Sequence, residues 1–322
     1  MGRVVVTGCA GFIGARVSEL LLDEEQEVVG LDLLDDAYDP RLKQWRLARL
    51  EARSNFRFHR VDVSRADALD ALPGDRCDAI FDLAARAGVR PSVERPQVYL
   101  DANVTGTVQL LQWARARAIP KLVLASTSSL YGNDNTVPYD ESQRTDRPLS
   151  PYAATKKAAE VLAFSWHHLH GIDVSVLRYF TVYGPAGRPD MAPLRFTKRI
   201  AEDEEITVYG DGAQRRDFTF VDDVARATVL AARPLGYEII NVGGDRPVVL
   251  TQLIGSLERA LGRTARIRHD TRHPADMLDT WAAIDKAERV LGWRPQIALE
   301  EGVERLASWY RAERDWARHA IP

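Results

Sequence analysis

The chain has 322 residues, of which 45% are hydrophobic and 28% are charged, and its formal net charge is -3. This composition is that of an ordinary globular protein, and it excludes the broad basic field that nucleic-acid binding requires. No apolar run is long enough to cross a membrane, and the chain starts with a strand and not with a signal peptide, so the sequence predicts a cytoplasmic protein. Cys9 and Cys77 are too few for a disulfide framework, and we expect both to be reduced.

The first predicted element is a strand over 3–7, which is followed by a glycine-rich loop and by a helix with Val17, Leu20, Leu21 and Leu22 on its apolar face. The glycines have the spacing Gly-x-x-Gly-x-x-Gly. In this context they permit a tight turn and let a pyrophosphate approach the backbone at the helix N-terminus. We therefore predict that a dinucleotide binds at Gly8, Gly11, Phe12, Ile13 and Gly14.

A second predicted strand, 27–31, ends at Asp32, eighteen residues after Gly14. A carboxylate at this place accepts a hydrogen bond from a ribose 2′-OH and repels a 2′-phosphate, which selects NAD over NADP. A simple loop carboxylate at a strand end is the alternative interpretation. The third strand, 56–61, leads to Asp62 and Val63, for which we predict a contact with the adenine ring.

Further buried strands are predicted over 79–85, 121–125 and 174–180, with helical segments between them. This alternation is typical of an α/β protein with a Rossmann-type, doubly wound parallel sheet, in which ligands bind at the carboxyl ends of the strands. The strand 237–241 is expected to rejoin this sheet. The Gly/Pro-rich loop 183–190 is longer than a linker needs to be, which favours a functional role.

The helix that starts at Pro151 carries a candidate general base. Proline suits the first turn of a helix, and Tyr152 and Lys156 lie four residues apart on one face. An ammonium beside a phenol favours the phenolate, so we expect Lys156 to lower the pKa of Tyr152. A solvated helix face with the same spacing is the alternative.

Two other kinds of site find no support. His167, His168 and His170 have no Cys or carboxylate partners at ligand spacing, so they predict a solvated helix surface and no metal site. Ser165 has no Gly-x-Ser-x-Gly setting, so a serine hydrolase is not indicated.

Taken together, the glycine loop, Asp32, the Ser/Thr cluster 126–129 before Tyr131-Gly132, and Tyr152-x-x-x-Lys156 resemble the extended short-chain dehydrogenase/reductases that act on nucleotide sugars. Within them the chain is most similar to the UDP-glucuronate 4-epimerases, on the segments 85–90, 152–157 and 180–191. The resemblance implies an isomerase with tightly held NAD and a UDP-sugar substrate. It also implies an NAD-binding domain of residues 1–181, to which 216–243 returns, and a smaller, interleaved C-terminal nucleotide-sugar-binding lobe of residues 182–215 and 244–322.

The resemblance implies roles for residues at the sugar. Tyr152 would take the proton from the 4-OH, Lys156 would also contact the nicotinamide ribose, and Thr127 would hydrogen-bond the sugar 4-oxygen. A 4-keto-glucuronate is a β-keto acid that loses CO₂ readily, so its carboxylate needs hydrogen-bond donors. Hydroxyl groups for this purpose are those of Thr127, Ser128, Ser129 and Thr181.

Other residues are implied for the remainder of the substrate. Arg188 would contact the carboxylate or the nucleotide, Arg216 the pyrophosphate, and Asp276 a uridine ribose hydroxyl. The second phosphate contact departs from the family pattern, since His273, beside Arg272, stands where Arg or Gln is usual.

Several alternatives stay open. The similar 4,6-dehydratases carry Asp-Glu at the positions of Ser128 and Ser129, and the UDP-glucuronate decarboxylases carry Glu at that of Ser129, so serine at both disfavours these lyases. Galactose-type 4-epimerases usually have Asn where Thr181 stands. A non-enzymatic NAD sensor would have no use for the Tyr152 base. Because related enzymes pair the helices 96–117 and 152–170 between subunits, we also expect a homodimer.

Overall fold

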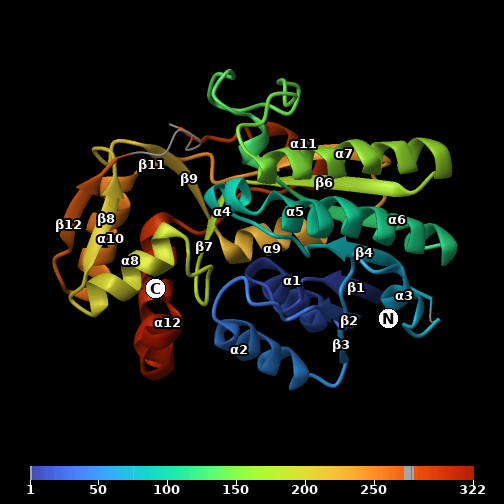
Figure 1. Cartoon of the computed structure of the whole chain (residues 1–322), viewed down its shortest axis with the longest axis horizontal. Helices are drawn as coiled ribbons and strands as arrows, with labels where there is room; N and C mark the ends of the chain where they lie inside the picture. Colours follow the sequence, from blue (N-terminus) through green and yellow to red (C-terminus); the bar gives the residue numbers. More distant parts are fainter. Residues whose placement is uncertain (1, 75, 272–276, 278) are drawn as a thin grey trace.

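The computed structural model describes residues 2–74, 76–271, 277 and 279–322. Seven parallel strands form the main sheet, in the order β10-β6-β5-β4-β1-β2-β3 (Figure 1). Their bounds are β1 Arg3–Thr7, β2 Glu27–Asp32, β3 Phe56–Arg60, β4 Ala79–Asp82, β5 Lys121–Thr127, β6 Asp173–Tyr179 and β10 Tyr237–Val242. The predicted α/β fold with a doubly wound parallel sheet is confirmed.

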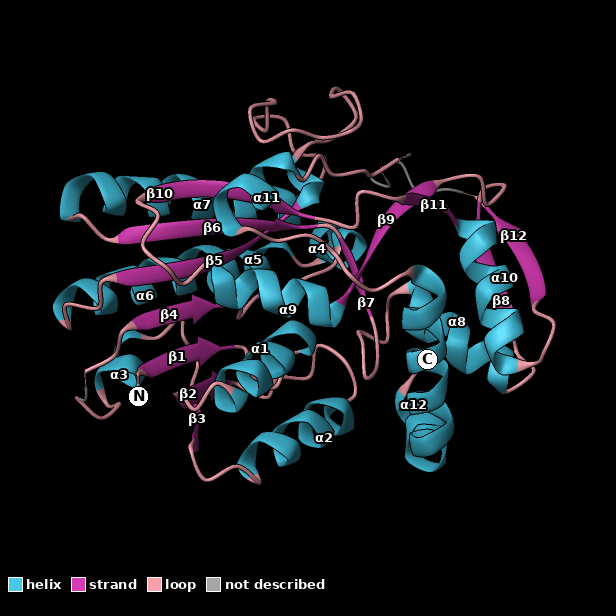
Figure 2. Cartoon of the chain, turned by 180° about the vertical axis from the view of Figure 1, so that it is seen from behind, coloured by secondary structure: helices cyan, strands magenta, loops and turns pink. Residues whose placement is uncertain are grey.

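Helices cover both faces of this sheet (Figures 1 and 2). Alternate side chains of a strand point to opposite faces. Val4 and Val6 of β1 accordingly belong to one hydrophobic core with the helices α1 and α9, while Val5 belongs to a second core with α6 and α7. The helices around the sheet are α1 Phe12–Asp23, α2 Pro40–Glu51, α3 Ala66–Asp70, α4 Val89–Glu94, α5 Pro96–Tyr99, the π-helical turn Leu100–Thr105, α6 Gly106–Ala116, α7 Pro151–His170, α9 Val221–Leu230 and α11 Asp285–Leu291.

Two small sheets and three helices lie beyond the carboxyl ends of the main sheet (Figure 2). The strands β7 Thr181–Tyr183, β9 Arg215–Phe220 and β11 Pro247–Val249 form one sheet, and β8 Glu205–Tyr209 and β12 Arg266–Asp270 form the other. The helices are α8 Ala192–Ala201, α10 Leu250–Leu261 and α12 Leu299–Ala320. The strand β10 returns to the main sheet beside β6, whereas β9 pairs with β7 and β11.

The predicted strand 79–85 is shorter in the structure and ends at Asp82. The chain turns there because the backbone N–H groups of Leu83 and Ala84 both donate to the Thr7 hydroxyl, at 3.1 and 3.0 Å. This bend places the loop 83–88 beside the glycine loop. No described helix combines the length and apolar character that a membrane crossing needs.

Candidate active site

The glycine loop is shaped by close backbone packing. Gly8 has a φ of +67°, which favours glycine, and a Cβ atom at Gly14 would lie 2.1 Å from the Gly8 carbonyl oxygen. Gly11 is the N-cap of α1 and provides no side chain to cap the helix; Phe12 is buried and Ile13 half-buried behind it. The first N–H groups of α1 are therefore not capped by a side chain, which fits a pyrophosphate.

Asp32 is held rigidly next to this loop. Its Oδ2 accepts from the Ala10 N–H at 3.1 Å, and its Oδ1 accepts from the Leu34 N–H at 2.7 Å. The Lys43 ammonium lies 3.4 Å from Asp32 and 2.6 Å from Asp35. Sequence reasoning missed Lys43, because its place depends on how α2 packs against the sheet.

Asp62 and Val63 follow β3, next to the end of β2. One Asp62 oxygen accepts from the Ser64 N–H at 3.0 Å and the Ser64 hydroxyl at 2.7 Å, which forms a tight turn. Val63 is buried, and its Cγ2 atom would lie 3.3 Å from a Cβ atom added at Gly106. The two residues thus lie at the same edge of the sheet as Asp32.

The helix α7 starts as predicted, with Pro151 in its first turn and the Ser150 hydroxyl accepting from the Ala153 N–H at 3.2 Å. Burial raises the pKa of Tyr152, while hydrogen bonding with Thr127 and the charge of Arg188 act in the opposite direction. The expected lowering of this pKa by Lys156 is therefore wrong for this structure.

The charges that act on Lys156 are those of two carboxylates. Burial lowers the pKa of Lys156, and the charges of Asp82 and Glu160 oppose that shift. Asp82 is buried at the end of β4, where it accepts from the hydroxyls of Thr7 at 3.0 Å and Thr107 at 3.1 Å. Burial raises the pKa of Asp82, and the Lys156 charge counteracts it. Sequence reasoning missed Asp82, because it lies in what reads as a buried strand.

The hydroxyl cluster lies where β5 ends beside β6. Thr127 is aligned with Tyr179, so Thr181, two residues further on, is close to the same edge of the sheet. The Thr127 Oγ1 donates to the Ser129 Oγ at 3.2 Å and accepts from the Ser129 N–H at 3.2 Å, and Ser128 is buried between them. Among the described residues, Ser126 of this cluster donates to the Glu160 carboxylate at 2.6 Å, whereas no hydrogen bond or ion pair brings a carboxylate to the hydroxyls of Thr127, Ser128, Ser129 or Thr181.

A cavity of about 230 Å³ opens next to Thr181. Two guanidinium groups line it, Arg216 of β9 and Arg195 of α8, together with Tyr209 at the end of β8. The Arg216 Nη2 donates to the Met277 carbonyl at 2.7 Å. Burial lowers the pKa of Arg195. Arg195 was not predicted, because its helix reads like any amphipathic surface helix. Asp276, His273 and Arg272 lie outside the described residues.

The loop 183–190 reaches back from the cavity to Tyr152. The Arg188 guanidinium forms a bidentate pair with Asp190, with Nε–Oδ1 at 3.1 Å and Nη2–Oδ2 at 2.5 Å, and its charge acts on Tyr152. The structure therefore brings Arg188, Tyr152 and Thr127 together.

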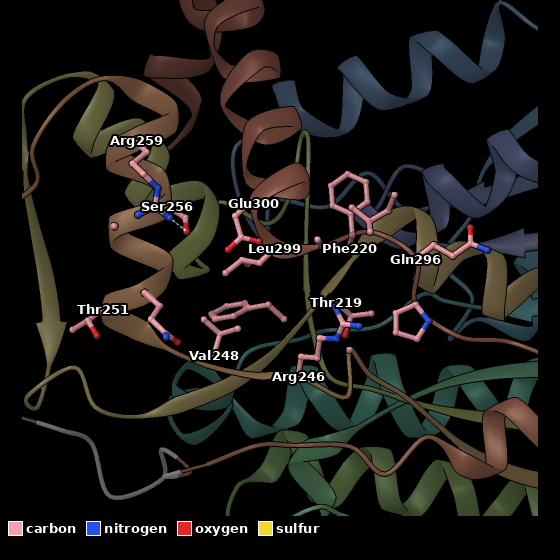
Figure 3. Close-up of a pocket in the computed structure, with 17 residues that line it drawn as sticks. Thr219, Phe220, Arg246, Val248, Thr251, Ser256, Arg259, Gln296, Leu299 and Glu300 are labelled. Atoms are coloured by element: carbon pink, nitrogen blue, oxygen red, sulfur yellow. Dashed lines mark hydrogen bonds between the residues drawn. The ribbon is translucent and has the colours of Figure 1, made fainter.

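A larger cavity, of about 650 Å³, lies further along β9 (Figure 3). Thr219 and Phe220 of β9, Arg246 and the α10 residues Thr251 and Arg259 are among its lining residues, but none of the predicted site residues is. The size of a cavity therefore does not locate the chemistry, and the convergent group around Tyr152 is the candidate active site. Nowhere in the described part of the chain are three or more His, Cys, Asp or Glu residues arranged to hold a metal ion.

Comparison with known proteins identifies the family of this chain. A family model described as "NAD dependent epimerase/dehydratase family" matches residues 4–243. The chain is 51% identical over 311 residues to a UDP-glucuronate 4-epimerase of Thermodesulfobacterium geofontis, with 96% of each chain covered.

Solved structures are similar over almost the whole chain. A Bacillus cereus UDP-glucuronic acid 4-epimerase in complex with UDP-glucuronic acid and NAD matches with a TM-score of 0.90 and 35% identity, covering 97% of this chain and 99% of that one. A Thermotoga maritima UDP-glucose 4-epimerase with UDP-glucose matches with a TM-score of 0.90 and 30% identity over the same shares. These matches confirm the predicted relationship: the chain belongs to the NAD dependent epimerase/dehydratase family, of the extended short-chain dehydrogenase/reductase type.

Proposed function

We propose that the protein is a UDP-glucuronate 4-epimerase, an isomerase that interconverts UDP-glucuronate and UDP-galacturonate with bound NAD. The observation that carries this proposal is the 51% identity, over 96% of both chains, to an enzyme of that name. The gathering of Tyr152, Thr127 and Arg188 at one edge of the sheet supports the same chemistry. In this proposal the NAD site lies in residues 1–181 with 216–243, and the sugar-nucleotide site in 182–215 and 244–322.

NAD would lie across the carboxyl ends of the strands. The N–H groups at Gly8, Gly11, Phe12, Ile13 and Gly14 would bind its pyrophosphate, Asp32 its adenosine ribose, and Asp62 and Val63 its adenine ring. Lys156, whose charge Asp82 helps to stabilise, would donate to the nicotinamide ribose. When bound, NAD⁺ supplies the hydride acceptor and adds a positive charge to the site.

Tyr152 would then act as the general base. Its phenolate takes the proton from the sugar 4-OH and returns it after the keto sugar has turned over in the site, so that no net oxidation occurs. Burial favours the neutral phenol, so Thr127, Arg188 and the charge brought by the cofactor must stabilise the phenolate. Positioned proton transfer of this kind contributes about 10²–10⁴-fold to the rate.

The sugar carboxylate must be kept from leaving as CO₂. Neutral hydroxyl donors at Thr127, Ser128, Ser129 and Thr181 would hydrogen-bond it, which disfavours the desolvated state from which CO₂ departs. The nearby Glu160 cannot act there, since its oxygens accept from Ser126 at 2.6 Å and from Arg178 at 2.9 Å.

The uridine diphosphate would bind in the cavity beside Thr181. Arg216 would contact the pyrophosphate, and Arg195 would supply the second cation, because guanidinium groups suit bidentate phosphate binding. Arg188 would contact the sugar carboxylate or the nucleotide, and Asp276 is proposed for the uridine ribose.

A homodimer and a cytoplasmic location are part of the same proposal. Val161, Phe164 and Leu169 on α7 are at least half exposed, at 53%, 50% and 66%, and they form an apolar stripe on the outside of the molecule. Pairing of α7 and α6 with a second copy would bury this stripe. Size-exclusion chromatography with light scattering would measure the mass, and a monomer would contradict this part.

A small set of incubations tests the activity. Purified protein with UDP-glucuronate and no added NAD should form UDP-galacturonate, which NMR of the anomeric region identifies. UDP-xylose as the main product would favour the decarboxylase. Activity on UDP-glucose alone would favour the alternative suggested by the Thermotoga maritima structure. No turnover even with added NAD would contradict an enzymatic role.

A further inference from the structure

Arg46 of α2 is buried, with 3% of its surface exposed, and makes five hydrogen bonds to neutral groups. Nε and Nη2 donate to the Ala186 carbonyl at 3.0 and 2.5 Å, and Nη2 also donates to the Gly187 carbonyl at 2.9 Å. Nη1 donates to the Ala10 carbonyl at 3.1 Å and to the Tyr38 hydroxyl at 2.8 Å. No salt bridge to Arg46 occurs among the residues that the structure describes.

These bonds join two loops that are far apart in the sequence. Ala10 lies in the glycine loop, where its N–H donates to Asp32, so Asp32 and Arg46 hold the two peptide groups that flank the Ala10 Cα atom. Ala186 and Gly187 belong to the strap, our name for residues 184–190, which comes after β7. The strap also packs on the glycine loop, since a Cβ atom at Gly187 would lie 3.7 Å from the Phe12 ring.

The strap is held in a conformation that it would not adopt alone. Ala186 has a φ of +48°, in the left-handed region that non-glycine residues rarely occupy. Such backbone persists only where the surroundings impose it. Two N–H groups of Arg46 on the Ala186 carbonyl, and the burial of Ala186 against α2 and α12, impose it here.

The charge of Arg46 points to an anion close by. A buried guanidinium without a carboxylate partner is costly, and carbonyl dipoles compensate it only in part. The glycine loop that Arg46 contacts is the segment at which we place the dinucleotide pyrophosphate. A diphosphate there would complement the charge, so cofactor binding and strap closure should favour each other.

We propose that Arg46 is a positioning residue that fastens the strap onto the glycine loop and thereby retains NAD through many turnovers. This inference rests on the proposed function, because an epimerase consumes no NAD and gains from keeping it. The strap carries Arg188 one residue beyond its anchor, so the same bonds also set the place of Arg188 beside Tyr152.

The test measures NAD release, a readout that does not involve the sugar. The holoprotein is diluted into an NAD-degrading enzyme, and the NAD that stays bound is counted over time for wild type, Arg46→Lys, Arg46→Met and Arg49→Met. Arg49 is the matched control, because it lies three residues further along α2 and is exposed beside Glu19. We expect NAD dissociation at least tenfold faster in Arg46→Met, an intermediate rate in Arg46→Lys and the wild-type rate in Arg49→Met.

A folded Arg46→Met protein that retains NAD as long as wild type would overturn the proposal. Thermal unfolding of the same samples shows whether the variants are folded at the assay temperature. If Arg46→Met does not fold, Arg46→Lys decides the question by the same criterion.

Hydrogen exchange of the wild-type protein is a second, independent test of the proposal. Loading with NAD should protect the strap together with residues 8–14. Protection of 8–14 alone would overturn the proposal. A protein that retains NAD through Arg46 but does not epimerise UDP-glucuronate would contradict only the proposed function.

Discussion

Glu160 of α7 and Arg178 of β6 form a bidentate ion pair inside the protein, with Nε–Oε1 and Nη2–Oε2 both at 2.9 Å. Both residues are 1% exposed. Glu160 also accepts from Ser126 at 2.6 Å, and Arg178 donates to the Tyr131 hydroxyl at 3.0 Å. The pair thus fixes α7 against β5 and β6 one helical turn beyond Lys156, directly behind the hydroxyl cluster.

Glu160→Gln should lower the free energy of unfolding by about 3–5 kcal/mol, because it leaves the Arg178 charge buried and unpaired. Glu301→Gln on α12, which breaks an exposed pair with Arg305, should cost no more than about 0.5 kcal/mol. Urea unfolding at pH 7 measures both. Equal effects of the two substitutions would contradict the assigned role of the pair.

The same pair predicts a pH dependence. Burial alone would raise the pKa of Glu160, but Arg178 outweighs it and holds the pKa below the ordinary value of 4.5. The unfolded chain therefore takes up the proton first as the pH falls. The stabilisation should be complete above about pH 4.5 and should be lost below it, as the pH falls through the folded-state pKa. The difference between wild type and Glu160→Gln should shrink accordingly on going from pH 7 to pH 3.5.

Tyr152→Phe should reduce epimerisation of UDP-glucuronate by about 10²–10⁴-fold and leave the fold intact, because it removes the general base and keeps the ring. Tyr99→Phe is the control: its ring packs edge-on against Tyr152, and its hydroxyl donates to the Ala87 carbonyl at 3.2 Å. It should retain most of the activity. Rates come from NMR, and near-normal turnover of Tyr152→Phe would refute the base assignment.

Asp32→Asn should weaken the preference for NAD over NADP by at least about tenfold, since it removes the charge that repels a 2′-phosphate. Lys43, 3.4 Å from Asp32, would then attract that phosphate. Asp35→Asn removes the other partner of Lys43 and leaves Asp32 in place, so the preference for NAD should remain. Fluorescence titration of cofactor-free protein with both dinucleotides measures the ratio of the two affinities. An unchanged ratio in Asp32→Asn would count against the ribose contact.

Ser128→Ala and Ser129→Ala should each lower kcat/KM for UDP-glucuronate by about tenfold or more, because a hydrogen bond to a charged group contributes about 1.5–3 kcal/mol. UDP-xylose should also become detectable among the products. Ser142→Ala, which removes an exposed hydroxyl that donates to Asp140, should change neither quantity. Unaltered kinetics and products in both variants would show that these hydroxyls do not hold the carboxylate.

Local patterns were sufficient to predict the main sheet and the cofactor loop. A glycine loop between a strand and a helix, the carboxylate at Asp32 and the start of α7 depend on residues close in sequence, and each lies where it was expected. The short strands β7 to β9, β11 and β12 were not predicted, because each is stabilised by a partner distant in the chain.

The sequence did not predict three residues of the candidate site, for the same physical reason. Asp82 contacts Thr7 of β1 and Thr107 of α6, and Lys43 contacts Asp32 through the packing of α2. Arg195 lines a cavity formed by five separate segments of the chain. The incorrect pKa prediction for Tyr152 followed from helix spacing alone, since burial and the pull of Asp82 on Lys156 are properties of the folded protein.

The central claim is that a hydride leaves C4 of the sugar and returns to the same carbon. UDP-glucuronate deuterated at C4, incubated with the holoprotein in ordinary water, tests it most directly by NMR and mass spectrometry. We predict UDP-galacturonate that keeps the deuterium at C4. Loss of the deuterium to water, or a pentose as the main product, would contradict the claim.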